Sequence, residues 1–228
     1  MVTIVLTPDK TMCANYTPVK DPQRLHMYFG VGGFHPTFPD ETWPGYVAPF
    51  ICQVRQQSAH ARELAVGLFG LVPHWAKDLT VARRTYNARS ETVSEKPSFR
   101  DAWAHGRRCI IPCDSIFEPN WESGKAVRWR IRLEDSAPMG VAGLWGSWGT
   151  PDGRELLSFT MLTINAAGHE VMQHFHKPED EKRMVVILDE SDYDRWLDAP
   201  GEAMPDFLTR YPAERMVAEP APRPVRSR

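Results

Sequence analysis

The sequence predicts an α+β fold, a single domain built on a curved, largely antiparallel, barrel-like sheet with a few peripheral helices. Several apolar or alternating segments of strand length follow one another with few helical segments between them. The 20 prolines and eight tryptophans favour turns, irregular connections and a strand-rich body over a helix bundle. A doubly wound parallel fold is not expected, because regular strand–helix alternation and a glycine-rich turn are both missing.

Chain length and composition fit one soluble domain. At 228 residues a core can form without disulfides, and the fractions of hydrophobic (42%) and charged (25%) residues are ordinary. The net charge of −2 does not point to a polyanionic partner, although local basic patches can still exist. The sequence shows no secretory signal and no apolar run near the ~20 residues that span a bilayer. We therefore expect a cytoplasmic protein with reduced thiols and no membrane contact.

The first third of the chain has the weakest patterns. Residues 1–12 have little character of their own and are interpreted as a leader or a mis-called start. Residues 21–64 mix short helical and extended signals. Residues 66–72, "VGLFGLV", form an apolar run that predicts a buried strand, and "PHWAKD" at 73–78 predicts a turn after it.

Stronger patterns follow in the middle of the chain. Apolar residues at helical spacing in "SEKPSFRDAWAHGRR" predict a helix that ends at Gly106. "CIIPCDSIFE" at 109–118 predicts a strand that leads to a bend at Pro119. Apolar and charged residues alternate through "AVRWRIRLE" at 126–134, and this period of two predicts a half-buried strand.

The last third predicts a hairpin and smaller elements. "MGVAGLWGSW" and "ELLSFTMLTI" predict two strands, and the "TPDGRE" turn between them predicts a hairpin. "HEVMQHF" predicts a short helix, "RMVVIL" a strand and "DESDYDRWLDA" a capped helix. We expect one domain over residues 13–217 and a flexible Pro/Arg-rich tail over 218–228.

Two cysteines have a spacing that invites a metal-site interpretation. Cys109 and Cys113 are four residues apart on a predicted hydrophobic strand. A zinc site needs further Cys or His ligands at short spacing, and His105 is the one close histidine. Buried structural thiols are therefore the favoured interpretation, and no metal is expected.

Three other segments carry polar groups suited to chemistry. Asn87, Arg89 and Glu91 in "TYNARSETV" follow a predicted buried strand, although a solvated loop is the simpler reading for each. Glu118 ends an apolar strand, where partial desolvation favours proton transfer near neutral pH, and a salt-bridged strand-end carboxylate is the alternative. His174 and His176 flank Phe175, so in an extended segment one of them faces inward.

The combination of motifs is more specific than any one of them. Met12-Cys13 is followed in order by "GLVPHWAKD", "NARSETV", "RRCIIPCDSIFEPNW", "AGLWGSW" and then "FTMLTINAA" with "HFHKPEDEKRMVVIL". Together they resemble the SOS response-associated peptidase (SRAP) family, whose members protect abasic sites in single-stranded DNA. The resemblance spans residues 12–198.

The resemblance implies a catalytic set on matching positions. The family's cysteine after the initiator methionine, its N-A-R-x-E-T asparagine, its F-x-E-W-like glutamate and its histidine before R-M-P correspond to Cys13, Asn87, Glu118 and His176. His176 is preferred to His174 because the family's usual pair is an apolar residue followed by histidine, as in Phe175-His176.

The resemblance also implies a DNA-binding surface. Trp75 and Arg89 match positions that the family uses around DNA, and other basic side chains are expected to add phosphate contacts. The predicted DNA-binding residues are Trp75, Arg83, Arg84, Arg89, Arg107, Arg108 and Arg183. For the alternating row Arg128, Arg130 and Arg132, a solvated strand face is at least as consistent with the pattern as DNA contact.

This sequence departs from the family pattern at three places. Ala14-Asn15-Tyr16 replaces Gly-Arg-Phe after the cysteine, so a basic residue near the nucleophile is lost. Pro119 and Asn120 separate Glu118 from the following tryptophan. The segment "KPEDEK" separates His176 from Arg183, and valine replaces the proline of R-M-P.

The activity that the resemblance implies is covalent crosslinking to single-stranded DNA at abasic sites, with lyase and autopeptidase activities as further implications. A free α-amine would attack the sugar aldehyde and the adjacent thiolate would close a thiazolidine ring, so the active form is expected to begin at Cys13 after removal of residues 1–12. No cofactor is expected. Two rival functions stay open, a thiol peptidase or amidase that uses Cys13 and His176, and a non-catalytic single-strand binder.

Overall fold

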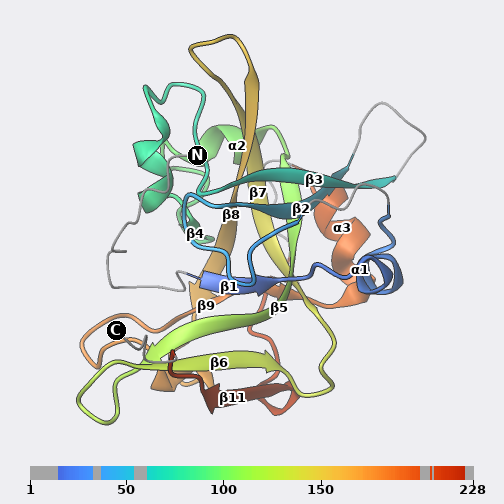
Figure 1. The fold of residues 1–228 in the computed structure, drawn as a ribbon. Coiled ribbons are helices and arrows are strands. Elements are labelled where there is room, and N and C mark those ends of the chain that lie inside the picture. Colours follow the sequence, from blue (N-terminus) through green and yellow to red (C-terminus); the bar gives the residue numbers. More distant parts are fainter. Residues whose placement is uncertain (1–14, 33–36, 54–60, 201–205, 207, 224–228) are drawn as a thin grey trace, which may run out of the picture.

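The computed structural model of the chain describes residues 15–32, 37–53, 61–200, 206 and 208–223 (Figure 1). Cys13 therefore lies outside the described residues, as does the predicted leader at 1–12. No helix in the described part of the chain is long and apolar enough to cross a membrane.

The described residues form a strand-rich body with short helices. The strands are β1 (Asn15–Pro18), β2 (Val47–Gln53), β3 (Arg62–Phe69), β4 (Asn87–Arg89), β5 (Arg108–Asn120), β6 (Val127–Leu133), β7 (Met139–Gly149), β8 (Glu155–Asn165), β9 (Arg183–Val185), β10 (Ile187–Leu188) and β11 (Met216–Pro220). The α-helices are α1 (Pro22–Phe29), α2 (Arg100–Ala104) and α3 (Tyr193–Asp198), and the 3-10 helices are η1 (Leu79–Arg84), η2 (Met172–His174), η3 (Glu190–Asp192) and η4 (Ala213–Arg215).

Five strands close into a barrel. The pairing order runs β7-β8-β3-β2-β5, and a further antiparallel pairing between β5 and β7 completes the ring (Figure 1). The β3–β8 pairing is parallel and the other four are antiparallel. The predicted α+β class with a curved, largely antiparallel, barrel-like sheet is therefore confirmed.

The barrel interior is filled with aromatic side chains. Phe159 packs against Phe50 and Phe69 with ring centroids 5.4 and 5.5 Å apart, and all three rings are fully buried. Gly143 lies where two strands come close, since an added Cβ would stand 2.4 Å from the Thr160 carbonyl oxygen. Burial of such rings supplies much of the free energy that holds the barrel closed.

The long β5 strand links the barrel to a second layer. Its first half pairs with β7, and its second half pairs with β1 on one side and β6 on the other (Figure 1). The predicted bend at Pro119 is wrong, because β5 continues through Pro119, which lies opposite Arg128 of β6. Proline's fixed φ suits an extended strand, and its carbonyl accepts a hydrogen bond from the His176 backbone.

Several predicted elements are confirmed. The strand expected at 66–72 is β3, although it begins at Arg62 and ends at Phe69, before residues 70–72. The turn after it lies at 73–78, and the alternating segment forms β6. The predicted hairpin is β7–β8, in register from Gly149 opposite Glu155. The helix expected to end at Gly106 is shorter than its pattern, because α2 covers five residues, and Gly106 adopts φ +60° after it.

Three smaller predictions need correction. The helix expected at 169–175 is a single 3-10 turn, η2. The strand expected at 183–188 is two strands, because Val186 marks a change of partner from β8 to β7. The helix expected at 189–199 is divided between η3 and α3, and neither has a side-chain hydrogen bond at its N-cap.

The boundary of the predicted flexible tail is also wrong. Residues 216–220 form strand β11, which pairs antiparallel with β6. Edge strand β6 offers free backbone groups, and a short segment at the end of the chain satisfies them. The Glu219 carboxylate on β11 pairs with Arg130 and Arg132, which shows that this part of the arginine row faces a strand partner. Residues 224–228 lie outside the described residues.

Candidate active site on strand β5

Glu118 and His176 meet in a buried pair. The His176 Nε2 atom lies 3.2 Å from the Glu118 Oε2 atom, and each side chain is 1% exposed. An antiparallel bridge between Asn120 and Phe175 and a 3.0 Å hydrogen bond from the His176 amide to the Pro119 carbonyl bring the two segments together. One of the two histidines faces inward, and it is His176, but the extended segment on which that prediction rested is not found. Residues two apart share a face of an extended strand, and here His174 ends the 3-10 turn η2 while His176 has a left-handed backbone.

The backbone at His176 is in a rare conformation. Its φ is +64°, a left-handed value that non-glycine residues seldom adopt and that often marks a functional position. The Lys182 ammonium donates to the carbonyls of His176 and Lys177, at 3.2 and 2.6 Å. The segment between His176 and Arg183 is thus folded back on itself, and it leaves His176 in contact with Glu118.

The pair determines the protonation of His176. Burial opposes the charged imidazolium, but the neighbouring Glu118 carboxylate outweighs burial and holds the pKa of His176 above its usual value of 6.5. No hydrogen-bond partner of the His176 Nδ1 atom is found within the described ranges. A buried imidazole beside a carboxylate can accept and return a proton, which is the arrangement that general acid–base chemistry needs.

Strand β1 brings the N-terminal side of the chain to the same strand. Asn15, the first described residue, lies opposite Phe117 of β5, the residue next to Glu118. The Asn15 amide donates to Glu41 at 2.9 Å, and Arg128 donates to the other oxygen of that carboxylate at 2.6 Å. Asn15 is therefore anchored from outside its own strand.

Asn87 is buried, but it comes from a separate strand. It opens β4, which pairs in parallel with β8, and it lies opposite Met161. The solvated-loop interpretation of this position is therefore wrong. Arg89, two residues later on the same short strand, is exposed.

The predicted DNA-binding residues divide into side chains that are at least partly exposed and side chains that are buried. Trp75 is 52% exposed, and its indole donates a long 3.4 Å hydrogen bond to the Pro97 carbonyl. Arg83 and Arg84 are exposed at the end of η1. Arg107 is partly exposed and lies near the Trp145 ring. These side chains are available to a ligand.

Arg108 belongs to the core, so its predicted phosphate contact is wrong. It is 1% exposed and lies between two indole rings, 3.7 Å from the Trp103 centroid and 4.5 Å from the Trp196 centroid. Its guanidinium also donates to the Pro200 carbonyl at 2.9 Å. Burial lowers the pKa of Arg108 to about 10, and the side chain stays charged through cation–π contacts.

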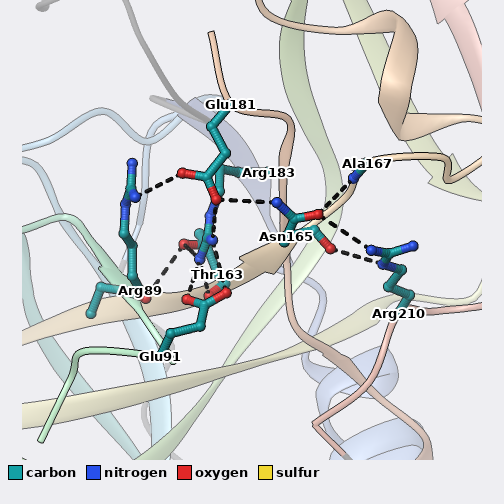
Figure 2. Close-up of polar contacts among 9 residues, drawn as sticks. Arg89, Glu91, Thr163, Asn165, Ala167, Glu181, Arg183 and Arg210 are labelled. Atoms are coloured by element: carbon teal, nitrogen blue, oxygen red, sulfur yellow. Dashed lines mark hydrogen bonds and ion pairs between the residues drawn. The ribbon is translucent and has the colours of Figure 1, made fainter.

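Arg183 is likewise enclosed, which corrects its prediction as a direct DNA contact. Its side chain is 3% exposed and makes a two-pronged ion pair with Glu91 at 2.9 and 2.8 Å. It also contacts Glu181 at 2.9 Å and donates to the Thr163 carbonyl at 2.7 Å (Figure 2). Arg183 therefore joins β8, β9 and the segment that follows β4.

The predicted structural thiols are confirmed. Cys52, Cys109 and Cys113 are buried and unpaired by disulfides. Burial raises the pKa of the Cys52 thiol to about 12, and it also raises the pKa values of Cys109 and Cys113 well above the usual thiol value. Such thiols are poor nucleophiles. Among the described side chains, no group of His, Cys, Asp and Glu has the arrangement of a metal site.

Comparison with known proteins identifies the family. The model of the family described as SOS response associated peptidase (SRAP) matches residues 12–228. The chain belongs to the SRAP family. The SRAP match begins at Met12, next to Cys13, and extends past the residue 198 limit of the motif resemblance to include β11.

Named proteins and a solved structure are similar to most of the chain. The abasic site processing protein YoqW of Bacillus subtilis (strain 168) is 35% identical over 201 residues, which cover 86% of this chain and 84% of YoqW. The abasic site processing protein HMCES of Pongo abelii is 27% identical over 179 residues, covering 64% of this chain and 48% of HMCES. A crystal structure of a protein from Bordetella bronchiseptica has 40% identity and a TM-score of 0.82, covering 92% of this chain and 99% of that one.

Sequence reasoning missed the residues that hold the site together. Glu41, Glu181 and Lys182 form contacts between segments far apart in the chain. Glu181, two positions before Arg183, gave a weak local signal of an ion pair between the two residues. Partners that meet only through the fold, such as Glu41 and Arg128, leave no mark in the spacing of residues.

Proposed function

We propose that this SRAP protein recognises abasic sites in single-stranded DNA and captures them covalently through Cys13 as the N-terminal residue. The observation that carries the proposal is the buried pair of Glu118 on β5 and His176, together with the pairing of β5 with β1, the strand that begins at Asn15, two residues after Cys13 in the sequence. The relatives named for abasic site processing support the same substrate class.

Chain connectivity supports the placement of the nucleophile. Asn15 lies opposite Phe117, and Cys13 is two residues before Asn15 in the sequence. An N-terminal cysteine has its α-amine and thiol on adjacent carbons. The α-amine, with an ordinary pKa of about 8, is partly neutral at physiological pH and can act as a nucleophile.

The proposed reaction conserves every atom of its two partners apart from one water. The α-amine adds to the C1 aldehyde of the opened sugar, and loss of water gives an imine. The Cys13 sulfur then adds to the imine carbon, a proton moves to nitrogen, and a thiazolidine ring results. Glu118 transfers protons at the amine and carbinolamine, and His176 assists sugar ring opening and the reverse hydrolysis.

The other residues position the substrate. Asn87 orients the amine or the sugar by hydrogen bonds from β4. Arg89 binds a flanking phosphate, and the exposed Trp75 ring stacks near the lesion. Arg83, Arg84 and Arg107 are placed to add phosphate contacts, so binding should weaken as salt rises.

The decisive experiment compares two forms of the protein that differ in their first residue. Protein beginning at Cys13 and protein beginning at Met1 are incubated with a single-stranded oligonucleotide that contains one abasic site, and covalent products are resolved on a denaturing gel. We expect a crosslink from the Cys13 form, none from an intact Met1 form, and none after Cys13→Ala. A crosslink that survives Cys13→Ala contradicts the thiazolidine mechanism.

Further assays on the same two forms of the protein separate the rival functions. A thiol peptidase needs no free α-amine, so peptide cleavage by an intact Met1 form would favour that class. Salt-sensitive binding to undamaged strands without any crosslink would favour a non-catalytic binder. Intact mass of the protein from its native host shows whether residues 1–12 are removed.

A further inference from the structure

Glu181 occupies an unusual position between two arginines. Its Oε2 atom lies 2.7 Å from Arg89 and its Oε1 atom lies 2.9 Å from Arg183, while Asn165 donates to the same carboxylate at 3.2 Å. Figure 2 shows this carboxylate lying between the two guanidinium groups. The arrangement presents one anion to two cations, which is how a protein commonly binds a phosphate.

The two arginines differ in what they can offer a ligand. Arg183 is 3% exposed and keeps its two-pronged pair with Glu91, so it remains neutralised without Glu181. Arg89 is 50% exposed, and its ion pair with Glu181 is at the surface. Removal of Glu181 would therefore leave Arg89 as the accessible cation.

We propose that Glu181 is an internal competitor of DNA that occupies the phosphate position on Arg89 until a strand binds. This inference rests on the proposed function, because it concerns the phosphate that Arg89 would hold. An exposed ion pair contributes little to stability, so a phosphate can displace the carboxylate from Arg89. Glu181 lies in the segment that separates His176 from Arg183. The same segment therefore holds His176 in position, through Lys182, and controls the affinity for DNA, through Glu181.

The charge of Glu181 is stable at neutral pH. Burial raises the pKa of its carboxyl, but hydrogen bonds from Arg183 and Asn165 outweigh burial and lower that pKa below its usual value. Glu181 is therefore anionic when DNA arrives, and Arg89 is bound to it. Binding of DNA to Arg89 therefore breaks one ion pair, between Arg89 and Glu181.

A pair of isosteric substitutions tests the inference. Glu181→Gln removes the charge and keeps the shape, while Glu179→Gln makes the same charge change at a 69% exposed residue whose carboxylate is 4.0 Å from Lys177. Affinity for an undamaged single-stranded oligonucleotide is measured by fluorescence anisotropy over a range of salt. This readout does not depend on the chemistry of Cys13.

Glu181→Gln is expected to bind about two- to fivefold more tightly than the unaltered protein at low salt. One more free cation should also steepen the slope of log affinity against log salt by about 0.7. Glu179→Gln should leave the slope unchanged. In a protein that already carries Arg89→Gln, adding Glu181→Gln should give no gain, because the cation that Glu181 masks is gone.

The outcomes are distinguishable. Equal tightening by both glutamate variants indicates general charge repulsion and overturns the inference, as does a gain that persists without Arg89. Salt-sensitive binding by the unaltered protein with no gain from Glu181→Gln overturns the inference alone. Failure of the unaltered protein to bind at low salt contradicts the proposed function as well. Glu181→Asp, whose shorter side chain cannot bridge both arginines, should give an intermediate gain if Glu181→Gln folds poorly.

Discussion

At the residue scale, two glutamate–histidine pairs lie close together in the sequence and differ in burial. Glu118 and His176 are 1% exposed, whereas Glu122 and His174, 2.6 Å apart, are 61% and 48% exposed. Solvent screens the outer pair, so it contributes little to stability. The inner pair couples folding to protonation, because the charged form of His176 is favoured in the folded state.

We therefore predict that the contribution of the Glu118–His176 pair to the free energy of unfolding depends on pH. The folded pKa of His176 is raised, so its contribution is fully present below the unfolded value of about 6.5 and is lost as pH rises through the folded pKa. Glu118→Gln should lower the free energy of unfolding by about 1–3 kcal/mol at acidic pH and by less at alkaline pH. Urea titrations from about pH 5 to pH 9 measure this difference.

The outer pair provides the matched control. Glu122→Gln removes the same charge from the exposed partner of His174 and should leave the free energy of unfolding essentially unchanged at any pH. A loss for Glu118→Gln that is constant across the pH range would contradict the linkage and indicate lost packing instead.

At the element scale, Arg108 joins one strand to two helices. Its guanidinium lies between Trp103 of α2 and Trp196 of α3, and the Trp196 indole donates to the Cys109 carbonyl at 2.8 Å. Such short helices gain little from their own hydrogen bonds, so tertiary packing must hold them. Arg108 is part of that packing.

Arg108→Ala should therefore destabilise the protein without weakening DNA binding. We expect a loss of about 2–4 kcal/mol, because the substitution removes two cation–π contacts and leaves space between two indoles. Thermal melting measures the loss, and the salt slope of oligonucleotide binding should stay that of the unaltered protein. Arg107→Ala, at the partly exposed neighbour, should show the opposite pattern. A shallower slope for Arg108→Ala would restore its predicted phosphate contact.

The sequence predicted elements with a regular period and missed those set by distant partners. The β7–β8 hairpin and the alternation in β6 have local signals, and both are confirmed. Strand β11 was missed because "AEPAPRP" has the composition of a flexible tail, and its pairing partner β6 lies over 80 residues earlier. The inward position of His176 was not predictable from alternation, because it depends on the 3-10 turn before it and on its left-handed backbone. The enclosure of Arg108 and Arg183 likewise depends on side chains that only folding brings near.

At the scale of the whole molecule, the two ends of the described chain meet at one ion pair. The Glu41 carboxylate receives Asn15 from β1 and Arg128 from β6. Arg128 also donates to the Ala221 carbonyl at 3.2 Å, and Arg223 lies 4.6 Å from the centre of the Trp43 ring. The C-terminal segment thus supports the strand from which the proposed nucleophile extends.

This arrangement predicts that the C-terminal segment affects capture at the other end of the chain. Removal of residues 216–228 takes away β11 and the contact of Ala221 with Arg128, and it exposes the edge of β6. We expect a lower melting temperature and slower crosslinking by protein that begins at Cys13, because Asn15 loses part of its anchorage. Truncation after Arg223 keeps β11 and the contacts of Arg128 and Trp43, so it should retain both properties.

Crosslinking rates below the melting transition separate positioning from folding. Glu41→Gln keeps β11 and weakens the anchor directly, so it should slow capture while changing the melting temperature less than the long truncation does. Normal capture by both Glu41→Gln and the long truncation would show that Asn15 is held by its pairing with β5 alone. If capture slows in both, the contacts of Glu41 and of the C-terminal segment contribute to capture as well as to folding, because they anchor strand β1 beside Glu118 on β5.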